Sequence, residues 1–235
     1  GLAEGMTVKA ELAHGPFALK ADVDTAAEAM KLEFTSASGK GSASFDAAKA
    51  SYDIAMGKTA VSVIGGPPEV EFRNVSMSVA ELGYGASVVI GDLTSPQDVR
   101  FVAKFVDLVL PPEVWAQADP TGAFGASPLT FVLELAGRYA LGPEMLEPGW
   151  APIPGAFPPV DIIDATLSKL LISGFDVTLA GDGSLGFDET DLVTYEGIPA
   201  PEGKISFRAT GVNALIDRVI AAGLVPQDEL TGFRF

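Results

Sequence analysis

The fold class is decided by residues Gly174–Val225, which read GFDVTLAGDGSLGFDETDLVTYEGIPAPEGKISFRATGVNALIDRVIAAGLV. Hydrophobic and polar residues alternate in Asp176–Leu179, Ser184–Asp188 and Lys204–Ala209. This period of two is typical of β-strands that have one buried and one solvated face. Gly181-Asp182-Gly183, between the first two runs, is a good tight-turn sequence. The stretch therefore predicts antiparallel strands joined by turns.

A short helix is predicted after the last of these strands. Gly211 breaks the strand, and hydrophobic residues then recur at helical spacing within Val212–Ala222. Gly223 is the expected C-terminal stop. Because a helix of this length is not stable in isolation, we expect its Leu215 and Val219 face to be buried against the concave side of the sheet.

The first half of the chain repeats the alternation. Three breaks interrupt it, at His14-Gly15-Pro16, Ser38–Gly41 and Gly57-Lys58, and each has alternating runs on both sides. We interpret these breaks as hairpin turns. A slip of the period near Asn74 indicates a bulge in the strand Val70–Ala80.

The joint between a strand and a helix occurs a second time. Asp98–Leu110 is a long, apolar strand that leads into Pro111-Pro112 and the predicted helix Glu113–Ala118, since proline suits the first helical turn. Leu129–Leu141 then returns as a strand. Residues Gly142–Pro159 contain six prolines and are the best candidate for a subdomain boundary.

The predicted fold is mainly β with short helices. Ile162–Phe175 is expected to be another strand, although Leu167, Leu170 and Leu171 also fit a helix. We expect a strongly twisted or curled antiparallel sheet, shaped like a half-barrel or groove, with about two short helices on its concave face. Residues 1–235 would form one β-rich domain or part of a longer one.

The composition excludes several classes of function. The net charge is −16, from 15 Lys and Arg against 31 Asp and Glu, so the protein repels phosphate backbones and we expect no nucleic-acid partner. The absence of cysteine excludes disulfides, thiol catalysis and Cys-ligated zinc. No apolar run approaches the ~20 residues that span a bilayer, so no transmembrane segment is expected.

Candidate catalytic and metal-binding residues are few. His14 is the only histidine, and we interpret it as an ordinary loop histidine rather than part of a triad or metal site. Asp182, Asp188, Glu189 and Asp191 cluster near a turn, but their spacing does not match a calcium-binding loop. The sequence therefore predicts no catalytic residue, cofactor or metal.

An apolar groove is the one candidate site. Trp115 lies on the first helix, after a long apolar strand, and aromatic residues of the neighbouring strands are placed to line a pocket with it. An ordinary aromatic core explains the same residues and is the favoured alternative. Together with the later helix, the candidate groove residues are Phe101, Phe105, Trp115, Phe131, Leu215 and Val219.

Two stretches, Phe101–Leu141 and Gly183–Pro226, resemble a known family. The matching positions are Leu108–Leu110, Trp115, Asp119-Pro120, Pro201, Gly203, Arg208, Gly211 and Leu215–Leu224. They resemble the domain-of-unknown-function family 2125, an uncharacterised secreted family of alphaproteobacteria. The chain departs from that pattern at Gly125-Ala126-Ser127-Pro128, where a Leu-Pro-Arg-Asp-Pro-like segment is more usual.

The resemblance implies a periplasmic protein, whose longer relatives carry a signal peptide that this chain does not show. The closing strand and helix are also similar to the AsmA-type proteins of Gram-negative envelopes, curled β structures with apolar grooves linked to lipid handling. We therefore expect a non-enzymatic periplasmic β protein that binds or shields an apolar ligand such as lipid. A structural or protein-interaction module of the envelope is the alternative, and a carboxylate-based hydrolase is the third hypothesis.

Overall fold

The computed structural model describes residues 5–24, 29–66, 73–89, 94–151, 159–188, 191, 193–194, 199–226 and 232. These residues form thirteen strands, two α-helices and one 3-10 helix. In chain order the elements are β1 Val8–His14, β2 Phe17–Asp24, β3 Ala29–Ser36, β4 Gly39–Phe45, β5 Lys49–Met56, β6 Thr59–Gly65, β7 Val75–Val79, β8 Glu81–Val89, β9 Gln97–Leu108, α1 Pro112–Ala118, β10 Leu129–Leu141, η1 Pro143–Leu146, β11 Val160–Gly174, β12 Val177–Asp188, β13 Ala200–Thr210 and α2 Val212–Ala221.

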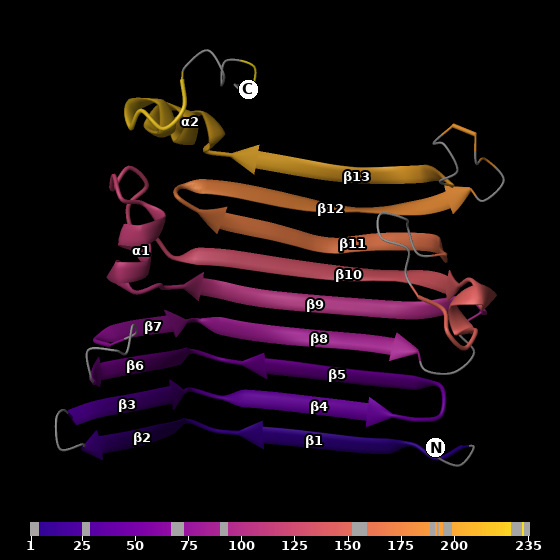
Figure 1. Cartoon of the computed structure of the whole chain (residues 1–235), viewed down its shortest axis with the longest axis horizontal. Helices are drawn as coiled ribbons and strands as arrows, with labels where there is room; N and C mark the ends of the chain where they lie inside the picture. Colours follow the sequence, from indigo (N-terminus) through magenta and orange to yellow (C-terminus); the bar gives the residue numbers. More distant parts are fainter. Residues whose placement is uncertain are drawn as a thin grey trace.

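The strands form two antiparallel sheets, as Figure 1 shows. The large sheet has nine strands in the order β1-β4-β5-β8-β9-β10-β11-β12-β13, and the small sheet has the order β2-β3-β6-β7. Neither sheet closes on itself. The prediction of a mainly β, curled antiparallel structure with two short helices is therefore confirmed.

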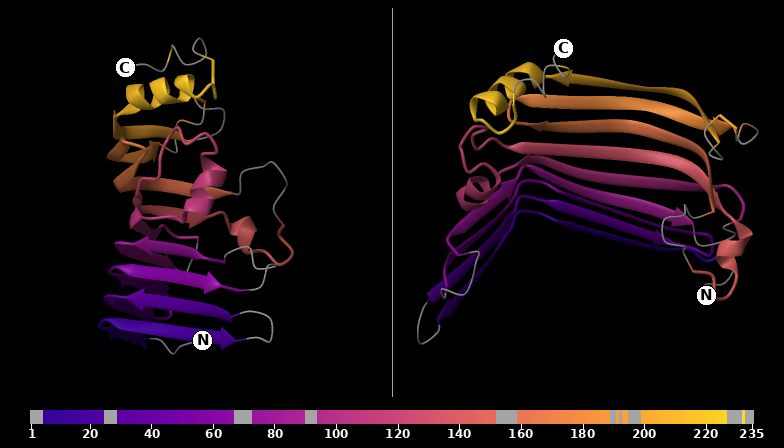
Figure 2. Two further views of the ribbon diagram at one scale, coloured as in Figure 1. Left: turned by 90° about the vertical axis from the view of Figure 1, so that its left-hand side faces the viewer. Right: turned by 45° about the horizontal axis from the view of Figure 1, so that its top comes forward.

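The two sheets share their strands across a corner (Figure 2). β1 continues into β2, β3 into β4, β5 into β6 and β7 into β8, with only one or two residues between the members of each pair. Pairing persists through the corner, where the Ala37 N–H donates to the Lys58 carbonyl at 2.8 Å and the Gly57 N–H donates to the Ser38 carbonyl at 2.9 Å. Each pair is therefore one long strand that bends.

The three predicted hairpin turns in the first half of the chain are wrong. Gly15-Pro16, Ala37-Ser38 and Gly57-Lys58 lie at the corner, where the chain keeps its direction along the strand pair. Small residues and proline interrupt a strand at a bend as they do at a turn, and the period of two continues on both sides. The true hairpin ends include Asp46, whose carboxylate accepts hydrogen bonds from the N–H groups of Ala48 and Lys49.

Two further local predictions are corrected. β12 runs unbroken from Val177 to Asp188, so Gly181-Asp182-Gly183 is not a turn. The turn lies earlier, at Phe175-Asp176, where both φ angles are positive, 56° and 61°, as a type I′ hairpin requires. Asn74, with φ 57°, precedes β7 and accepts a hydrogen bond from the Gly65 N–H at 2.8 Å, so it closes a hairpin instead of forming a bulge.

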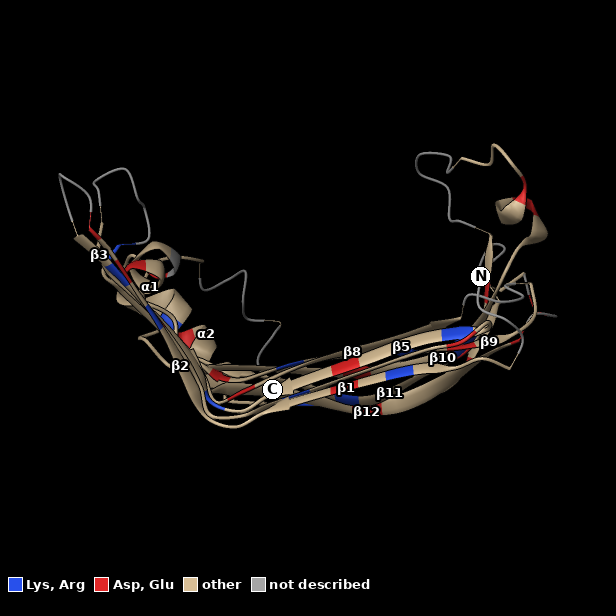
Figure 3. Cartoon of the chain, turned by 90° about the horizontal axis from the view of Figure 1, so that it is seen from below, with Lys and Arg blue, Asp and Glu red and all other residues tan. Residues whose placement is uncertain are grey.

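Both predicted helices are present, and Figure 3 places them on the concave side of the corner, at one end of the large sheet. In α2 the most buried residue is Ile216, while Leu215 and Val219 are half-buried. The Arg218 guanidinium donates to the Phe175 carbonyl and pairs with the Asp176 carboxylate at 3.2 Å. The helix is therefore attached to the β11–β12 turn.

Residues 142–159 connect β10 to β11 within the large sheet. These two strands pair from Thr130 opposite Ser173 to Leu141 opposite Val160. The Gly142 N–H donates to the Pro159 carbonyl at 2.7 Å and so joins the two ends of the connection. The segment that was expected to mark a subdomain boundary therefore joins two hydrogen-bonded neighbours of one sheet, and its residues 152–158 lie outside the described residues.

The described part of the chain has a thin core. Its buried hydrophobic residues are Val79, Val89, Ala103, Trp115, Val132, Ala140 and Ile216. Among the described residues no large side chain is fully enclosed. This is the burial expected of a single layer of sheet, because no second sheet covers either face.

Gly183 offers a test of the continuous β12 strand. Its φ is 150°, and a Cβ at this position would overlap the Lys204 carbonyl oxygen of β13. We expect Gly183→Ala to lower the free energy of unfolding by about 2–4 kcal/mol, from backbone strain and displaced pairing. Urea unfolding measures the change.

Gly186→Ala is the matched control in the same strand. The nearest atom to a Cβ there is the Glu202 carbonyl oxygen at 3.9 Å, and its φ is not positive. We expect a change within about 0.5 kcal/mol. Equal losses in the two variants would contradict the described register between β12 and β13.

Candidate functional site

The strand register sorts the side chains of the large sheet onto two faces. Cross-strand partners lie on the same face of a sheet, so the pairing can be followed from edge to edge. One complete row crosses all nine strands through Leu12, Gly41, Ile54, Tyr84, Ala103, Leu133, Leu170, Gly181 and Phe207. This row contains no charged residue, and its only side-chain polar atom is the Tyr84 hydroxyl.

A neighbouring row on the other face is different. It runs through Ala13, Lys40, Ala55, Gly83, Lys104, Val132, Leu171, Ala180 and Arg208. Three of its nine residues are cationic. Inter-strand ion pairs reinforce this face, among them Arg100 with Asp53 at 2.7 Å and Arg138 with Asp164 at 2.6 Å.

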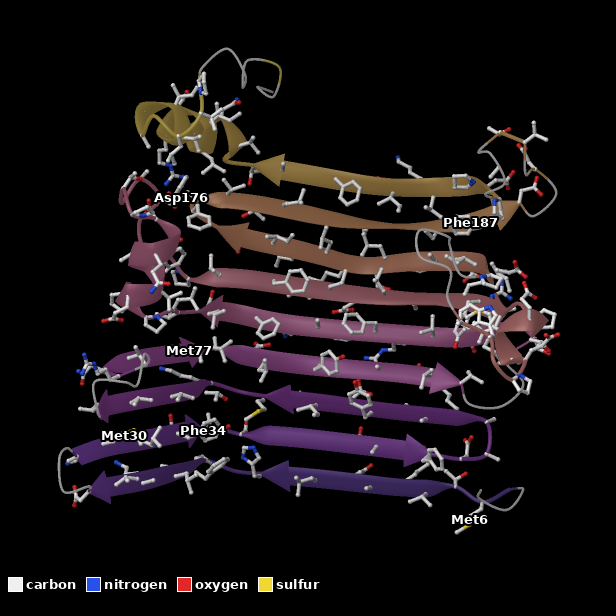
Figure 4. The ribbon with its side chains drawn as sticks, in the orientation of Figure 1. Met6, Met30, Phe34, Met77, Asp176 and Phe187 are labelled. Atoms are coloured by element: carbon white, nitrogen blue, oxygen red, sulfur yellow. The ribbon has the colours of Figure 1, made fainter. Side chains whose placement is uncertain are left out.

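The apolar face is the concave one. Phe34, which is labelled in Figure 4, lies on the side of the ribbon toward which the corner opens. Its ring contacts Phe17, with ring centroids 5.6 Å apart, and Phe17 contacts His14 across the corner at 4.8 Å. His14 belongs to the apolar face of the large sheet, so the apolar faces of both sheets line the inside of the bend.

This concave face exposes many large hydrophobic side chains to solvent. Leu12 is 73% exposed and Phe207 is 61% exposed, at the two edge strands of the large sheet. The exposed hydrophobic residues on this face of the large sheet are Val8, Leu12, Phe45, Tyr52, Ile54, Tyr84, Val88, Val99, Phe105, Leu135, Ile162, Ile172 and Phe207. Soluble proteins rarely leave an apolar surface of this extent uncovered unless it binds something.

Every charged residue with a cross-strand partner in the described strands lies on the convex face. This holds for Glu11, Asp53 and Asp98 as well as for Lys9 and Lys204. Asp182 and Asp188, two members of the acidic cluster in the sequence, also lie there. The concave face is thus uncharged across the paired residues.

The predicted groove residues divide into two groups. Phe101, Phe105 and Phe131 lie on the concave face, and Phe105 is directly opposite Phe131 across β9 and β10. Trp115 is only 7% exposed and packs edge-on against Phe175, with ring centroids 5.4 Å apart. Trp115 therefore belongs to a small core at the end of the sheet and not to the open surface.

The remaining predicted residues, Leu215 and Val219, are half-buried in α2 beside that small core. The sequence interpretation missed the larger part of the concave face, which includes Leu12, Tyr52 and Tyr84. The sequence did contain a pattern that could have identified these residues, because hydrophobic and polar residues alternate in β1, β4, β5, β8 and β9. Only the register showed that these alternating residues join the phenylalanines of β9 and β10 in one surface.

Few polar groups lie on the concave face. His14 is the last residue of β1 and not a loop residue, and its Nδ1 lies 2.8 Å from the Gly15 carbonyl oxygen. Tyr52 and Tyr84 lie side by side with ring centroids 5.7 Å apart, and Tyr84 contacts Phe101 at 5.5 Å. A hydrogen bond to the Tyr84 side chain raises the pKa of Tyr52, with burial adding to the effect.

The described residues contain no group of three or more His, Asp or Glu arranged to hold a metal ion. Asp191 accepts hydrogen bonds from the Thr194 hydroxyl and from the N–H groups of Thr194 and Val193, which together lower its pKa. This is a local turn. Glu189 lies outside the described residues.

Asp119 organises the segment that follows α1. Burial alone would raise the pKa of this carboxyl, but hydrogen bonds from the Phe124 N–H, the Thr121 hydroxyl and the Ala123 and Gly125 N–H groups hold it below its ordinary value. The Phe124 ring packs on Phe175 at 5.4 Å. Asp119 therefore supports the small core around Trp115.

A comparison with known proteins found no family model, no curated protein and no solved structure that matches the chain. The resemblance to the domain-of-unknown-function family 2125 and to AsmA-type proteins accordingly stays a prediction. Across the described residues, neither helix has the length and hydropathy needed to cross a bilayer.

The Asp119 carboxylate predicts a pH-dependent contribution to stability. Because its folded-state pKa lies below the ordinary value, its stabilisation is fully present above that ordinary value and is lost as the pH falls through the folded pKa. We expect Asp119→Asn to lower the free energy of unfolding at pH 7. The difference in free energy of unfolding between the variant and the wild type should become smaller at acidic pH. Urea unfolding across pH 3–7 measures this.

Asp22→Asn is the control, since Asp22 is an exposed carboxylate in the middle of β2. Its free energy of unfolding should stay close to that of the wild type. If the difference in free energy of unfolding between Asp119→Asn and the wild type does not change with pH, the carboxylate charge is not the stabilising feature.

Proposed function

We propose that the protein binds the acyl chains of a lipid on the concave face and performs no catalysis. The single observation that carries this proposal is the uncharged, solvent-exposed apolar face that spans all nine strands of the large sheet. Acyl chains are uncharged and flexible, so they match a surface that offers hydrophobic contact and almost no hydrogen-bonding groups. The periplasmic location suggested by the family resemblance is part of the same proposal.

The shape of the molecule supports an elongated apolar ligand. The corner between the sheets and the two helices bound one side of the concave face, and the 3-10 helix η1 lies at the other end of the strands (Figures 1 and 3). A chain lying along this face would contact hydrophobic side chains from successive strands. Burial of apolar surface contributes about 25 cal/mol per Å², so both ligand and protein would gain from the contact.

The carboxylate-based hydrolase is less well supported. Such an enzyme needs two carboxyl groups that face each other across a substrate cleft. In the paired strands the carboxylates lie on the convex face, where Asp53, Glu81 and Asp164 are engaged in ion pairs with cations. The concave face therefore supplies contact surface and not acid–base chemistry.

A protein-interaction role in the envelope is favoured by one specific feature, the open sheet edges. β1 and β13 each have a single neighbour in the large sheet, so their outer backbone groups are available to pair with a strand of another protein. This alternative uses the edges and the lipid proposal uses the face. The two are therefore separable by substitutions on the face alone.

A charge placed on the concave face should weaken the binding of an apolar probe. Ile54 is 46% exposed and belongs to the apolar row, so Ile54→Lys is expected to fold. We expect it to weaken binding of the uncharged fluorophore diphenylhexatriene about tenfold or more, because the ammonium group must stay hydrated. Fluorescence titration measures the affinity.

Ala55→Lys is the matched control, since Ala55 is the next residue in β5, is exposed and points to the convex face. Its affinity for the probe should equal that of the wild type. Equal affinities for all three proteins, or no binding by the wild type, would overturn the proposed function.

A further inference from the structure

A pocket with a glycine floor lies on the concave face, among the described strands of the large sheet. It has a volume of about 440 Å³ and is formed where β1, β4 and β5 meet the corner. Gly39 and Gly41 of β4 form its floor, while Leu12, Ile54 and His14 stand around it. The size lies within the range of small-ligand pockets.

At Gly39 the His14 side chain occupies the space above the floor, whereas the nearest atom to a Cβ on Gly41 would be the Asp53 carbonyl oxygen at 3.9 Å. A Cβ on Gly39 would overlap the His14 imidazole, including Nε2. The His14 ring is held from the other side by Phe17, edge-on at 4.8 Å. The imidazole is thus fixed in the pocket wall by a strand neighbour and by a ring across the corner.

The hydrogen bond of Nδ1 determines what Nε2 can do. Nδ1 lies 2.8 Å from the Gly15 carbonyl oxygen, and because a carbonyl oxygen can only accept, Nδ1 must carry the proton. In the neutral imidazole Nε2 is then an acceptor with a free lone pair. The pocket therefore presents the Nε2 acceptor to a ligand, beside the apolar side chains of Leu12 and Ile54 and the side chain of Tyr52.

The surrounding charges select the kind of group that can donate to Nε2. The elements around the ring are β1, β2, β4 and β5, and their charged residues have cross-strand partners on the opposite face of each sheet. Glu11, Lys40 and Asp53 belong to the lining of the pocket, but the register directs their side chains to the convex face. The chain also carries a net charge of −16. Both features disfavour an anionic head group and favour a neutral donor.

We infer that this pocket binds a neutral lipid with a free hydroxyl group, which donates a hydrogen bond to His14 Nε2 while the hydrocarbon chain extends along the concave face. The inference rests on the proposed function and adds the ligand class. The hydroxyl pair of Tyr52 and Tyr84, whose ring centroids lie 5.7 Å apart, adjoins the pocket, since Tyr52 is part of its lining. It offers a second polar contact to a longer ligand.

Three single-chain probes of equal chain length test the inference. They are 1-dodecanol, which donates a hydrogen bond, its methyl ether, which cannot donate, and laurate, which is anionic. Each competes with diphenylhexatriene for the wild-type protein below its aggregation concentration. We expect dodecanol to bind about three- to tenfold more tightly than the ether, the value of one hydrogen bond, and laurate to bind most weakly.

Substitution of His14 tests whether Nε2 causes the preference for the alcohol over the ether. His14→Phe keeps an aromatic ring but has no acceptor, so the alcohol and the ether should bind equally well. His14→Gln restores an acceptor oxygen, so part of the preference should return. Circular dichroism verifies that both variants fold. If His14→Phe does not fold, the affinities of the wild type for the alcohol and for the ether still test the inference.

The failure of this inference differs from the failure of the proposed function. Equal affinity of the wild type for alcohol and ether, or tightest binding of laurate, would overturn the neutral hydroxyl ligand while diphenylhexatriene still bound. A preference for the alcohol that survives in His14→Phe would also overturn it. Loss of all probe binding by the wild type would overturn acyl-chain binding itself.

Discussion

The rest of the structure depends on the alternation of side chains in a single layer of sheet. Because successive residues point to opposite faces, a period of two, shifted at the bulges of β11, gathers the hydrophobic residues on one side and the charges on the other. The row from Leu12 to Phe207 and the row from Ala13 to Arg208 are the two products of that alternation. Since no second layer of described strands covers the apolar side, the usual core of a β protein is an exposed surface here.

The corner gives this surface its concave form. Four long strands bend within one or two residues and keep their pairing, so hydrophobic rows of both sheets face inward. The contacts His14–Phe17 and Phe17–Phe34 join the two apolar faces at the bend. The small core around Trp115 and Phe175, organised by Asp119 and Arg218, fixes the helices at the same end of the large sheet.

Much of the secondary structure could be predicted because it depends on local pattern. The strand Leu129–Leu141 and both short helices were identified with almost their final bounds. The corner could not be predicted, because Gly57-Lys58 breaks an alternating run in the same way at a bend and at a turn. Gly183 was mistaken for a turn residue, since its real constraint is the backbone of β13, which is distant in sequence.

The sequence by itself determined the mainly β class, the periodic separation of polar and apolar residues, and the absence of thiol chemistry, since each follows from composition or local spacing. It also identified Phe101, Phe105 and Phe131 as possible ligand contacts. Only the tertiary structure decided that Trp115 is core, that Leu12, Ile54 and Tyr84 share a face with those phenylalanines, and that His14 overlies Gly39. The reason is that cross-strand register and the bend arise from pairing between distant segments, which no local pattern encodes.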